Sequence, residues 1–336
     1  RLLARRRRRA AILPEGRRFS LEARTPGAAA LRWHRGRRGG RLPAATVGVS
    51  ARGGPGLLLR QRAAAGGRGD PAHLAAVTEA ALEEVSRLEG RLSRFDATSE
   101  LARIHRETAR GPAKLDAELF AILADCLRWR RLTAGWFDVA AGTSGNAKAE
   151  PYTLDAERRT RTLADPSILL DFGGYAKGYA LDAAARLLSE YGVADALLHG
   201  GTSSIRTLGG GAEGEGSGEA GWPIALVDPA SPEEAALPGV LLRLRSAGLS
   251  SSAVRHAGSA ASSDVLNPHT GRAVEGEGAC VVIAANALTA EVLSTALVAM
   301  GRARAEAWLA AVPAELRPGL RVGWIEPAAP SRLEWL

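Results

Sequence analysis

The chain has 336 residues, 46% of them hydrophobic, so it is long and apolar enough to bury a large core. Its net charge of +8 is concentrated in the first 41 residues, which hold 14 arginines and only two glutamates, while the rest carries 30 basic and 34 acidic groups. This distribution argues against a nucleic-acid enzyme, which more often has a basic face on its folded part. Two cysteines, Cys126 and Cys280, provide no disulfide framework or metal-ligand spacing, and we expect both to be buried thiols.

The charge pattern divides the chain into two predicted parts. Residues 1–43 are expected to form a disordered basic arm, with binding to acidic surfaces as the alternative. Residues 44–328 are expected to form one compact body, in which the Gly/Glu-rich stretch 209–221 is a mobile loop. No apolar run is long enough to span a membrane. We favour a cytoplasmic location, and because position 1 is arginine, export stays open if the N-terminus is incomplete.

The elements alternate along the chain between helical and strand patterns. A short strand is expected in 56–62, a helix from Pro71, a helix beginning at Ser99-Glu100 and another that ends at Gly135. Residues 167–174 read as a buried strand ending in a turn, and 175–192 as a helix with Gly192 at its end. The remaining expected elements are strands in 195–201, 222–229, 240–252 and 279–286 and helices over 289–301 and 303–312. This order predicts an α+β fold with mainly antiparallel sheets and helices packed against them.

The segment "DFGGYAKGYALD", residues 171–182, places a glycine-rich turn before a helix. Glycines let the backbone approach a ligand closely, and the free N–H groups of a helix start attract phosphate. Lys177 would add a positive charge there, and it is one of only three lysines among 44 basic residues. Asp171 could accept a hydrogen bond from a base or ribose. The alternative is a tight strand–helix connection with a surface lysine.

A second candidate site is the segment "TAEVLSTALVAMG", residues 289–301. Glu291, Ser294 and Thr295 have i, i+3, i+4 spacing and therefore share one face of a helix. A carboxylate and two hydroxyls offer the oxygen ligands that suit Mg²⁺. The alternative is a capped helix start, with Thr289 as N-cap and Glu291 favourable in the first turn.

Several ordered motifs together resemble the FAD:protein FMN transferase family (flavin transferase, ApbE). They are "LSRFDATSELARIH", "FD", "DFGGYAKGYALD", "HGG", "WPIALVDP", "LSSS", "DVLNPHTGRAV" and "AEVLSTALVAMG", which begin at residues 92, 137, 171, 199, 222, 249, 264 and 290. The resemblance covers roughly residues 85–310, and motifs in this order are far more specific than any one of them. It implies a T-fold-like α+β body and transfer of the FMN half of FAD to a Thr or Ser hydroxyl of an acceptor flavoprotein. That reaction is Mg²⁺-dependent and releases AMP.

The resemblance also assigns roles to residues at matching positions. FAD contacts are implied for seven residues: Phe95, Trp136, Phe137, Asp138, Asp171, Lys177 and Leu266. Metal positions are implied for four: Gly174, Glu291, Ser294 and Thr295. Glu291 stands where the family has aspartate, and the longer side chain can still bind Mg²⁺.

The region of the general base departs most from the family pattern. Asp264 stands at the histidine of the family's "H-x-x-DP", and Asn267 at its aspartate. "SSSAVR" replaces "ATSGDY", and "HGGTSSI" replaces "NAGGDI". Asp264 with the nearby His256 and His269 are therefore the candidate catalytic residues. A flavin-binding protein or FAD pyrophosphatase without protein flavinylation is the alternative function, and an interaction protein acting through the arginine arm is a third.

Overall fold

A computed structural model of the chain describes residues 60–61, 71–108, 111–143, 149–201, 203–210, 221–227, 236–254, 265–276, 278–326 and 331–336. The predicted arm, most of the 209–221 loop, and the candidate catalytic residues His256 and Asp264 lie outside this part. Within it, no helix is both long and apolar enough to cross a membrane.

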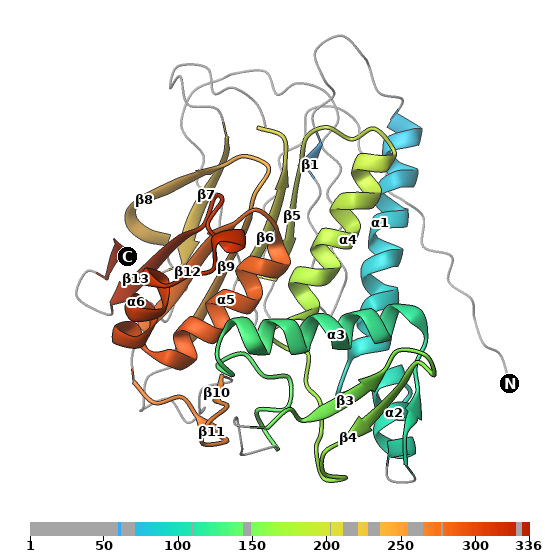
Figure 1. The fold of residues 1–336 in the computed structure, drawn as a ribbon. Helices are drawn as coiled ribbons and strands as arrows, with labels where there is room; N and C mark the ends of the chain where they lie inside the picture. The colour runs from blue at the N-terminus through green and yellow to red at the C-terminus, as the bar shows by residue number, and fades with distance from the viewer. Residues whose placement is uncertain are drawn as a thin grey trace, which may run out of the picture.

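A seven-stranded antiparallel sheet forms the centre of the molecule (Figure 1). Its strand order is β1 (Arg60–Gln61), β5 (Ala196–Gly200), β6 (Ser204–Leu208), β9 (Gly248–Val254), β12 (Gly278–Ala284), β13 (Arg321–Glu326) and β14 (Arg332–Trp335). Neighbouring strands in this order pair antiparallel throughout, as predicted. Because β14 pairs with β13, the sheet continues past the predicted boundary at residue 328.

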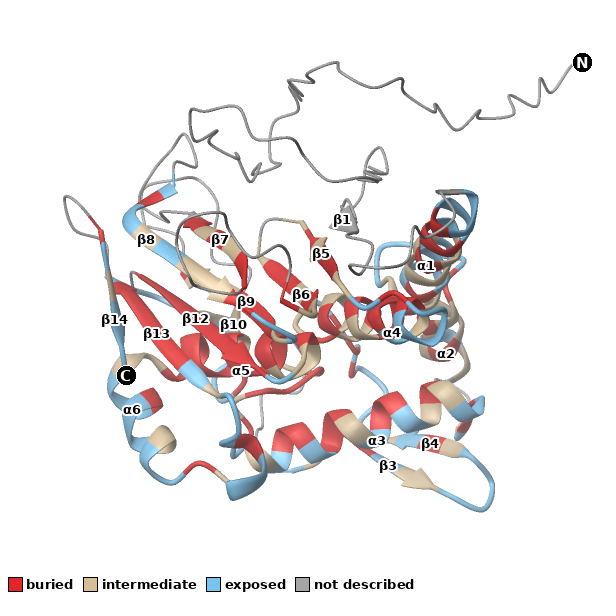
Figure 2. Cartoon of the chain, turned by 90° about the horizontal axis from the view of Figure 1, so that it is seen from above, coloured by how far each residue is buried: buried red, intermediate tan, exposed pale blue. Residues whose placement is uncertain are grey.

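Strand β12 is buried along its whole length because both faces of the sheet are covered (Figure 2). Val281 and Ile283 pack on the side of the hairpin formed by β7 (Trp222–Val227) and β8 (Ala236–Leu244). Cys280 and Val282 belong to the cluster on the opposite side, which contains the helix α5 (Ala287–Met300). A continuous apolar run is what a strand covered on two faces requires. Cys280 and Cys126 are both free and buried, as predicted.

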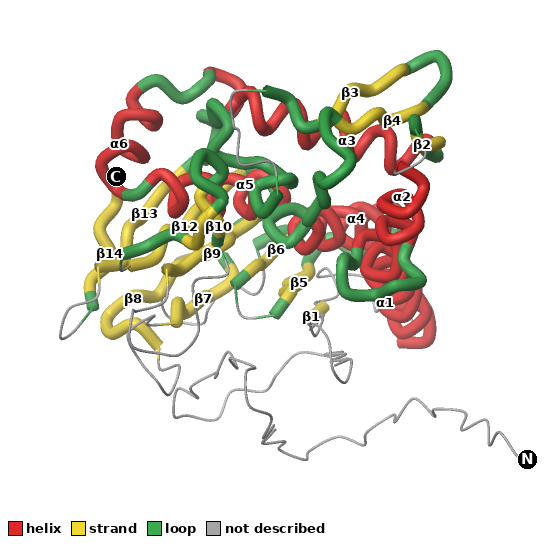
Figure 3. Tube along the Cα trace, turned by 90° about the horizontal axis from the view of Figure 1, so that it is seen from below, coloured by secondary structure: helices red, strands yellow, loops and turns green. Residues whose placement is uncertain are grey.

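Helices cover the face of the sheet opposite the β7–β8 hairpin (Figure 3). Helix α5 packs on β9 and β12, α4 (Ala176–Glu190) packs on α5, and α1 (Pro71–Leu92) packs on α4. Helix α4 ends at Glu190, and Gly192, two residues later, has a left-handed φ of 82° that suits glycine after a helix. Two helices follow α5 in the chain, α6 (Arg302–Ala310) and the 3-10 turn Ala314–Leu316.

The remaining elements lie beside this layered body (Figure 3). They are α2 (Glu100–Thr108), α3 (Ala117–Leu132), the three-stranded sheet of β2 (Ala113–Lys114), β4 (Thr160–Leu163) and β3 (Tyr152–Asp155), and the small hairpin of β10 (Leu266–Asn267) and β11 (Arg272–Ala273). Buried side chains of α3 join those of α5 in one hydrophobic cluster, so this part is continuous with the main core.

Three local predictions were wrong. The expected strand 240–252 is divided between β8 and β9, which belong to different sheets. Residues 167–174 do not form a strand, because their backbone has no ladder partner in the described part of the chain and is held by single hydrogen bonds instead. Helix α5 begins at Ala287 rather than after Thr289, because the side chain of Asn286 accepts a hydrogen bond from the Thr289 N–H at 2.8 Å. Glu291 therefore lies beyond the first turn of α5, and its place is not explained by the helix dipole.

Candidate functional site

The glycine-rich turn begins in an extended segment that is fastened at separate points. The Asp171 N–H donates to the Val139 carbonyl at 2.7 Å, and the Leu170 N–H donates to Nε2 of His105 at 2.9 Å. One Asp171 oxygen accepts from the Gly173 N–H at 2.9 Å, and the other pairs with Arg94 at 3.1 Å. The carboxylate thus faces the turn while staying half exposed to solvent.

The hydrogen bond between the Leu170 N–H and His105 depends on pH. Burial, followed by the nearby Arg161 guanidinium, lowers the pKa of His105 from 6.5 to about 4. Nε2 must be unprotonated to accept the hydrogen bond from the Leu170 N–H. In the window between these two values the unfolded chain binds more protons than the folded one, so stability is fully present above pH 6.5 and falls towards pH 4.

We therefore expect His105→Gln to flatten the dependence of unfolding free energy on pH. Glutamine can accept the same hydrogen bond but does not titrate. Urea denaturation of parent and variant between about pH 5 and about pH 7 measures this effect. Parallel stability profiles of the two proteins would show that His105 does not couple folding to pH.

The turn and helix α4 lie unusually close to α5. A Cβ added at Gly174 would stand 3.0 Å from the hydroxyl oxygen of Thr295. A Cβ at Gly178 would stand 2.6 Å from the Ala287 carbonyl oxygen and 2.7 Å from Cα of Leu288. Glycine at both positions therefore allows the glycine-rich turn and α4 to contact the face of α5 that carries the predicted metal residues.

Lys177 and Glu291 meet at this junction. Nζ of Lys177 lies 2.8 Å from Oε1 of Glu291, whose side chain is only 3% exposed. Oε2 of Glu291 accepts hydrogen bonds from the hydroxyls of Ser204 and, at 3.0 Å, Ser250. A buried carboxylate that is ion-paired and hydrogen-bonded has its desolvation cost offset. The lysine predicted to face an anion is thus held, in this structure, by the carboxylate predicted to bind metal.

Ser294, predicted as a metal residue, is fully buried in a network of hydroxyls. Its hydroxyl lies 3.0 Å from that of Ser250 and 2.9 Å from that of Ser252, and it donates to the Glu291 carbonyl at 3.1 Å. Ser250 and Ser252 both lie on β9, so these contacts connect α5 to that strand.

Sequence reasoning missed Asp182 as a residue that positions the site. Its carboxylate accepts from the N–H groups of Ala287 and Leu288 at 3.0 and 2.8 Å and pairs with Arg206 at 3.1 Å. Burial raises the pKa of Asp182, although the two backbone bonds act in the opposite direction. Asp182 therefore ties α4 to the first turn of α5. Its position in the "YALD" motif was the available signal.

The predicted aromatic residues separate into exposed and buried ones. Phe95 is 84% exposed, with the Arg94 guanidinium 4.5 Å from its ring centroid. Phe137 is buried against Tyr175, with ring centroids 6.5 Å apart. Phe95 and its neighbour Arg94, which pairs with Asp171, are available to a ligand at the turn. Phe137 shapes the core beneath it.

Asp138 is also committed to the protein interior. It is buried, its Oδ2 accepts from Nε of Arg130 at 2.8 Å, and its Oδ1 accepts from the Ala140 N–H at 2.8 Å. Its carboxylate fixes the backbone that runs beside Asp171.

Trp136 and His269 lie toward the other end of α5 from Lys177. Their ring centroids are 4.4 Å apart, and the Arg304 guanidinium lies 5.6 Å from the Trp136 ring. Burial, then Arg130 and Arg304, lower the pKa of His269, so its ring is neutral near pH 7. Leu266, on the hairpin that carries His269, lies against Gly142. The structure thus does not bring His269 into contact with Glu291.

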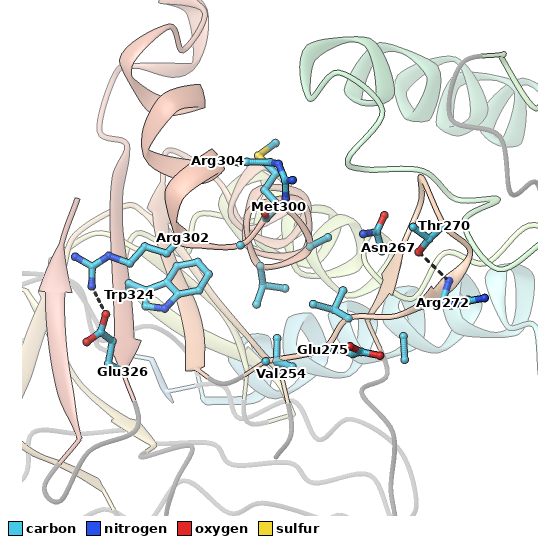
Figure 4. A pocket seen from close by; sticks show the side chains of 16 residues that line it. Val254, Asn267, Thr270, Arg272, Glu275, Met300, Arg302, Arg304, Trp324 and Glu326 are labelled. Carbon is cyan, nitrogen blue, oxygen red and sulfur yellow. Dashed lines mark hydrogen bonds and ion pairs between the residues drawn. The ribbon is translucent and has the colours of Figure 1, made fainter. Parts of the chain in front are cut away.

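A hollow of about 780 Å³ opens beside this second group of residues (Figure 4). Asn267 and Thr270, which flank His269, line it together with Arg304 and Trp324. None of its lining residues belongs to the Lys177–Glu291 junction. Its volume is in the range of small-molecule sites. It lies at the C-terminal end of α5, however, and is therefore separate from the Lys177–Glu291 junction.

The donor set at the junction fits a hard cation. Among the described residues, no three His, Cys, Asp or Glu side chains gather as a metal cluster. Glu291 would therefore bind such an ion together with hydroxyl or backbone oxygens and water. The Thr295 hydroxyl lies next to Gly174 and supplies one such oxygen. A Cβ at Gly174 would crowd this hydroxyl. Mg²⁺ suits this arrangement because it keeps several waters and takes few carboxylates.

Comparisons with known proteins give a consistent result. A family model described as the ApbE family matches residues 59–317. The FAD:protein FMN transferase of Haemophilus influenzae is 25% identical over 261 residues, which cover 68% of this chain and 72% of that protein. The FAD:protein FMN transferase of Vibrio cholerae is 26% identical over 255 residues, which cover 66% and 72%.

Solved structures agree on the fold. The ApbE protein of Thermotoga maritima superposes with a TM-score of 0.66 at 19% identity, over 84% of this chain and 93% of that one. The flavin transferase ApbE from Vibrio cholerae has a TM-score of 0.64 at 21% identity, over 88% and 96%. The predicted α+β body with antiparallel sheets is thereby confirmed. Because the family model spans most of the sequence, the chain belongs to the ApbE family.

Proposed function

We propose that this chain transfers the FMN moiety of FAD to a Thr or Ser hydroxyl of an acceptor protein and releases AMP. Family membership and the two curated FAD:protein FMN transferases support the reaction class. The observation that carries the proposal is the junction where the glycine turn, Lys177, Glu291 and Thr295 meet. The junction combines a glycine-rich turn that can approach phosphate, the Lys177 ammonium for the substrate, and oxygen ligands of Glu291 and Thr295 for a metal ion.

In the proposed reaction, the acceptor oxygen forms a bond to the phosphorus of the FMN half. The bond from that phosphorus to the bridging oxygen breaks, and the oxygen leaves with AMP. Lys177 supplies positive charge to the pyrophosphate, and the glycines of the turn let the backbone approach it closely. Asp171 and Phe95 would hold the nucleoside by hydrogen bonding and stacking.

Glu291 and Thr295, with the backbone at Gly174, are the residues that would hold Mg²⁺. When bound, the ion would neutralise charge on the pyrophosphate and polarise the phosphorus. The hydroxyl proton of the acceptor must pass to a base. Asp264, His256 and His269 are the proposed candidates; the ring of His269 is neutral, but it lies away from the Lys177–Glu291 junction.

A test of the reaction class uses FAD, Mg²⁺ and an acceptor flavoprotein. The acceptor is then separated on a denaturing gel and viewed for flavin fluorescence. We expect a fluorescent acceptor band. Release of AMP and free FMN without a band would identify a pyrophosphatase, and bound FAD with no AMP would identify a flavin-binding protein.

Lys177→Ala is expected to weaken FAD binding by about 1–3 kcal/mol, the scale of a lost charge-assisted contact. Flavin fluorescence titration measures the affinity. Lys114→Ala is the matched control, because Lys114 is an exposed lysine on β2. Equal FAD affinities for parent and Lys177→Ala would show that the lysine serves only the fold.

A further inference from the structure

The two oxygens of Glu291 are held in different ways. Oε2 is bound by Ser204 and Ser250, whose side chains are buried and fixed by strands β6 and β9. Oε1 is bound by Nζ of Lys177, whose side chain is 38% exposed. Breaking the serine contacts would leave buried hydroxyls and a buried carboxylate oxygen unsatisfied. Releasing Lys177 exposes only a long, flexible side chain to water.

A second polar partner lies within reach of the Lys177 ammonium. The Ser203 hydroxyl lies 3.5 Å from its Nζ, and the partial exposure of the side chain gives water access to the ammonium. A lysine ammonium is a point charge on a rotatable stem, so it can change partners without movement of α4. Glu291, buried at 3% exposure, cannot leave its place as easily.

We propose that Lys177 is an exchangeable counter-ion of Glu291. A divalent cation binds Oε1 of Glu291 only when the ammonium leaves it, because two cations cannot occupy one buried oxygen without strong repulsion. The carboxylate stays compensated throughout, first by Lys177 and then by the cation. The released ammonium becomes available to the pyrophosphate. This exchange rests on the proposed function, specifically on Glu291 being a metal residue.

The exchange links the two ligands of the site. Metal binding frees the cation that FAD needs, and an anion that attracts Lys177 in turn uncovers Glu291. Each ligand should therefore tighten the binding of the other, as reciprocal coupling requires. Ser204 and Ser250 hold Oε2 of Glu291 during the exchange, so that Oε1 keeps its orientation after Lys177 leaves.

The first test is calorimetric titration of the FAD-free protein with Mg²⁺ alone. Lys177→Met removes the competing charge and keeps a side chain of similar length. We expect it to bind Mg²⁺ at least about tenfold more tightly than the parent, in contrast to its weaker FAD binding. Lys114→Met is the matched control for the loss of one positive charge and should bind like the parent.

Equal or weaker Mg²⁺ binding by Lys177→Met would overturn the exchange, as would a parent protein that binds no Mg²⁺ without FAD. Neither result touches the FMN transfer reaction, which the acceptor gel tests separately. A tightening of the same size in Lys114→Met would also overturn it, because the effect would then be one of net charge.

A second test needs no variant. The parent is treated with a limiting amine-acylating reagent, with and without Mg²⁺, and labelling is quantified by peptide mass spectrometry. We expect Mg²⁺ to raise the labelling rate of Lys177 at least about threefold, since Glu291 covers Nζ in the ion pair and hinders the approach of the reagent. Lys114 in the same sample should not change. Unchanged or slower labelling of Lys177 would contradict its release.

Discussion

Glu291→Gln is expected to lower FMN transfer at least about 100-fold, the scale of removing a main electrostatic contribution to a transition state. The amide has the shape of the carboxylate: its oxygen can still accept from Lys177, and its NH₂ can face Ser204 and Ser250. The fold should therefore persist while the negative charge for Mg²⁺ is lost. Initial rates of AMP release at varied Mg²⁺ concentration measure the loss.

Glu291→Asp is the control for this result. It keeps the charge but withdraws the oxygens by one methylene, away from the two serines. We expect it to retain more activity than Glu291→Gln and to require more Mg²⁺. A glutamine variant with the activity and metal requirement of the parent would place the metal elsewhere.

Gly178→Ala is expected to destabilise the protein by about 1–3 kcal/mol, the range for overpacking a rigid contact. The added Cβ would lie 2.6 Å from a backbone oxygen and 2.7 Å from a backbone carbon of α5, and neither atom can rotate away as a side chain would. The two helices must separate, which also disturbs the Lys177–Glu291 junction. Chemical denaturation measures the change in unfolding free energy.

Gly90→Ala is the matched control, since Gly90 also lies within a helix but an added Cβ meets nothing within 4 Å. Alanine is favoured over glycine in helices by about 1 kcal/mol, so this variant should be as stable as the parent or more stable. If both variants gain stability, the close approach of α4 and α5 does not constrain the fold.

The sequence allowed good prediction of the elements with strong local signals. Helices α1, α4 and α5 have the periodicity or apolar length that packing on a sheet demands, and β12 has the apolar run of a strand covered on both faces. The residue patterns alone predicted the glycine turn and the carboxylate of α5 as two separate candidates, and only the family resemblance placed Gly174 and Glu291 at one metal site. Their meeting depends on glycines that let α4 approach α5, which one sequence does not reveal.

Contacts between distant residues account for the rest. Ser204 and Ser250 are 87 and 41 residues from Glu291, and a lone serine in a strand gives no sign of its partner. Residues 167–174 have the composition of a buried strand, yet no strand among the described residues is placed to pair with them. The start of α5 was misplaced because Thr289 and Asn286 are both good capping residues.

We propose that FMN transfer takes place at the Lys177–Glu291 junction. Its most direct test is the ratio of AMP released to flavin bound covalently on the acceptor, measured by chromatography and intact mass with FAD and Mg²⁺ present. We expect one AMP for each flavin attached to a Thr or Ser, with both products lost in Glu291→Gln. AMP formed without attached flavin, or both products formed unchanged by Glu291→Gln, would contradict it.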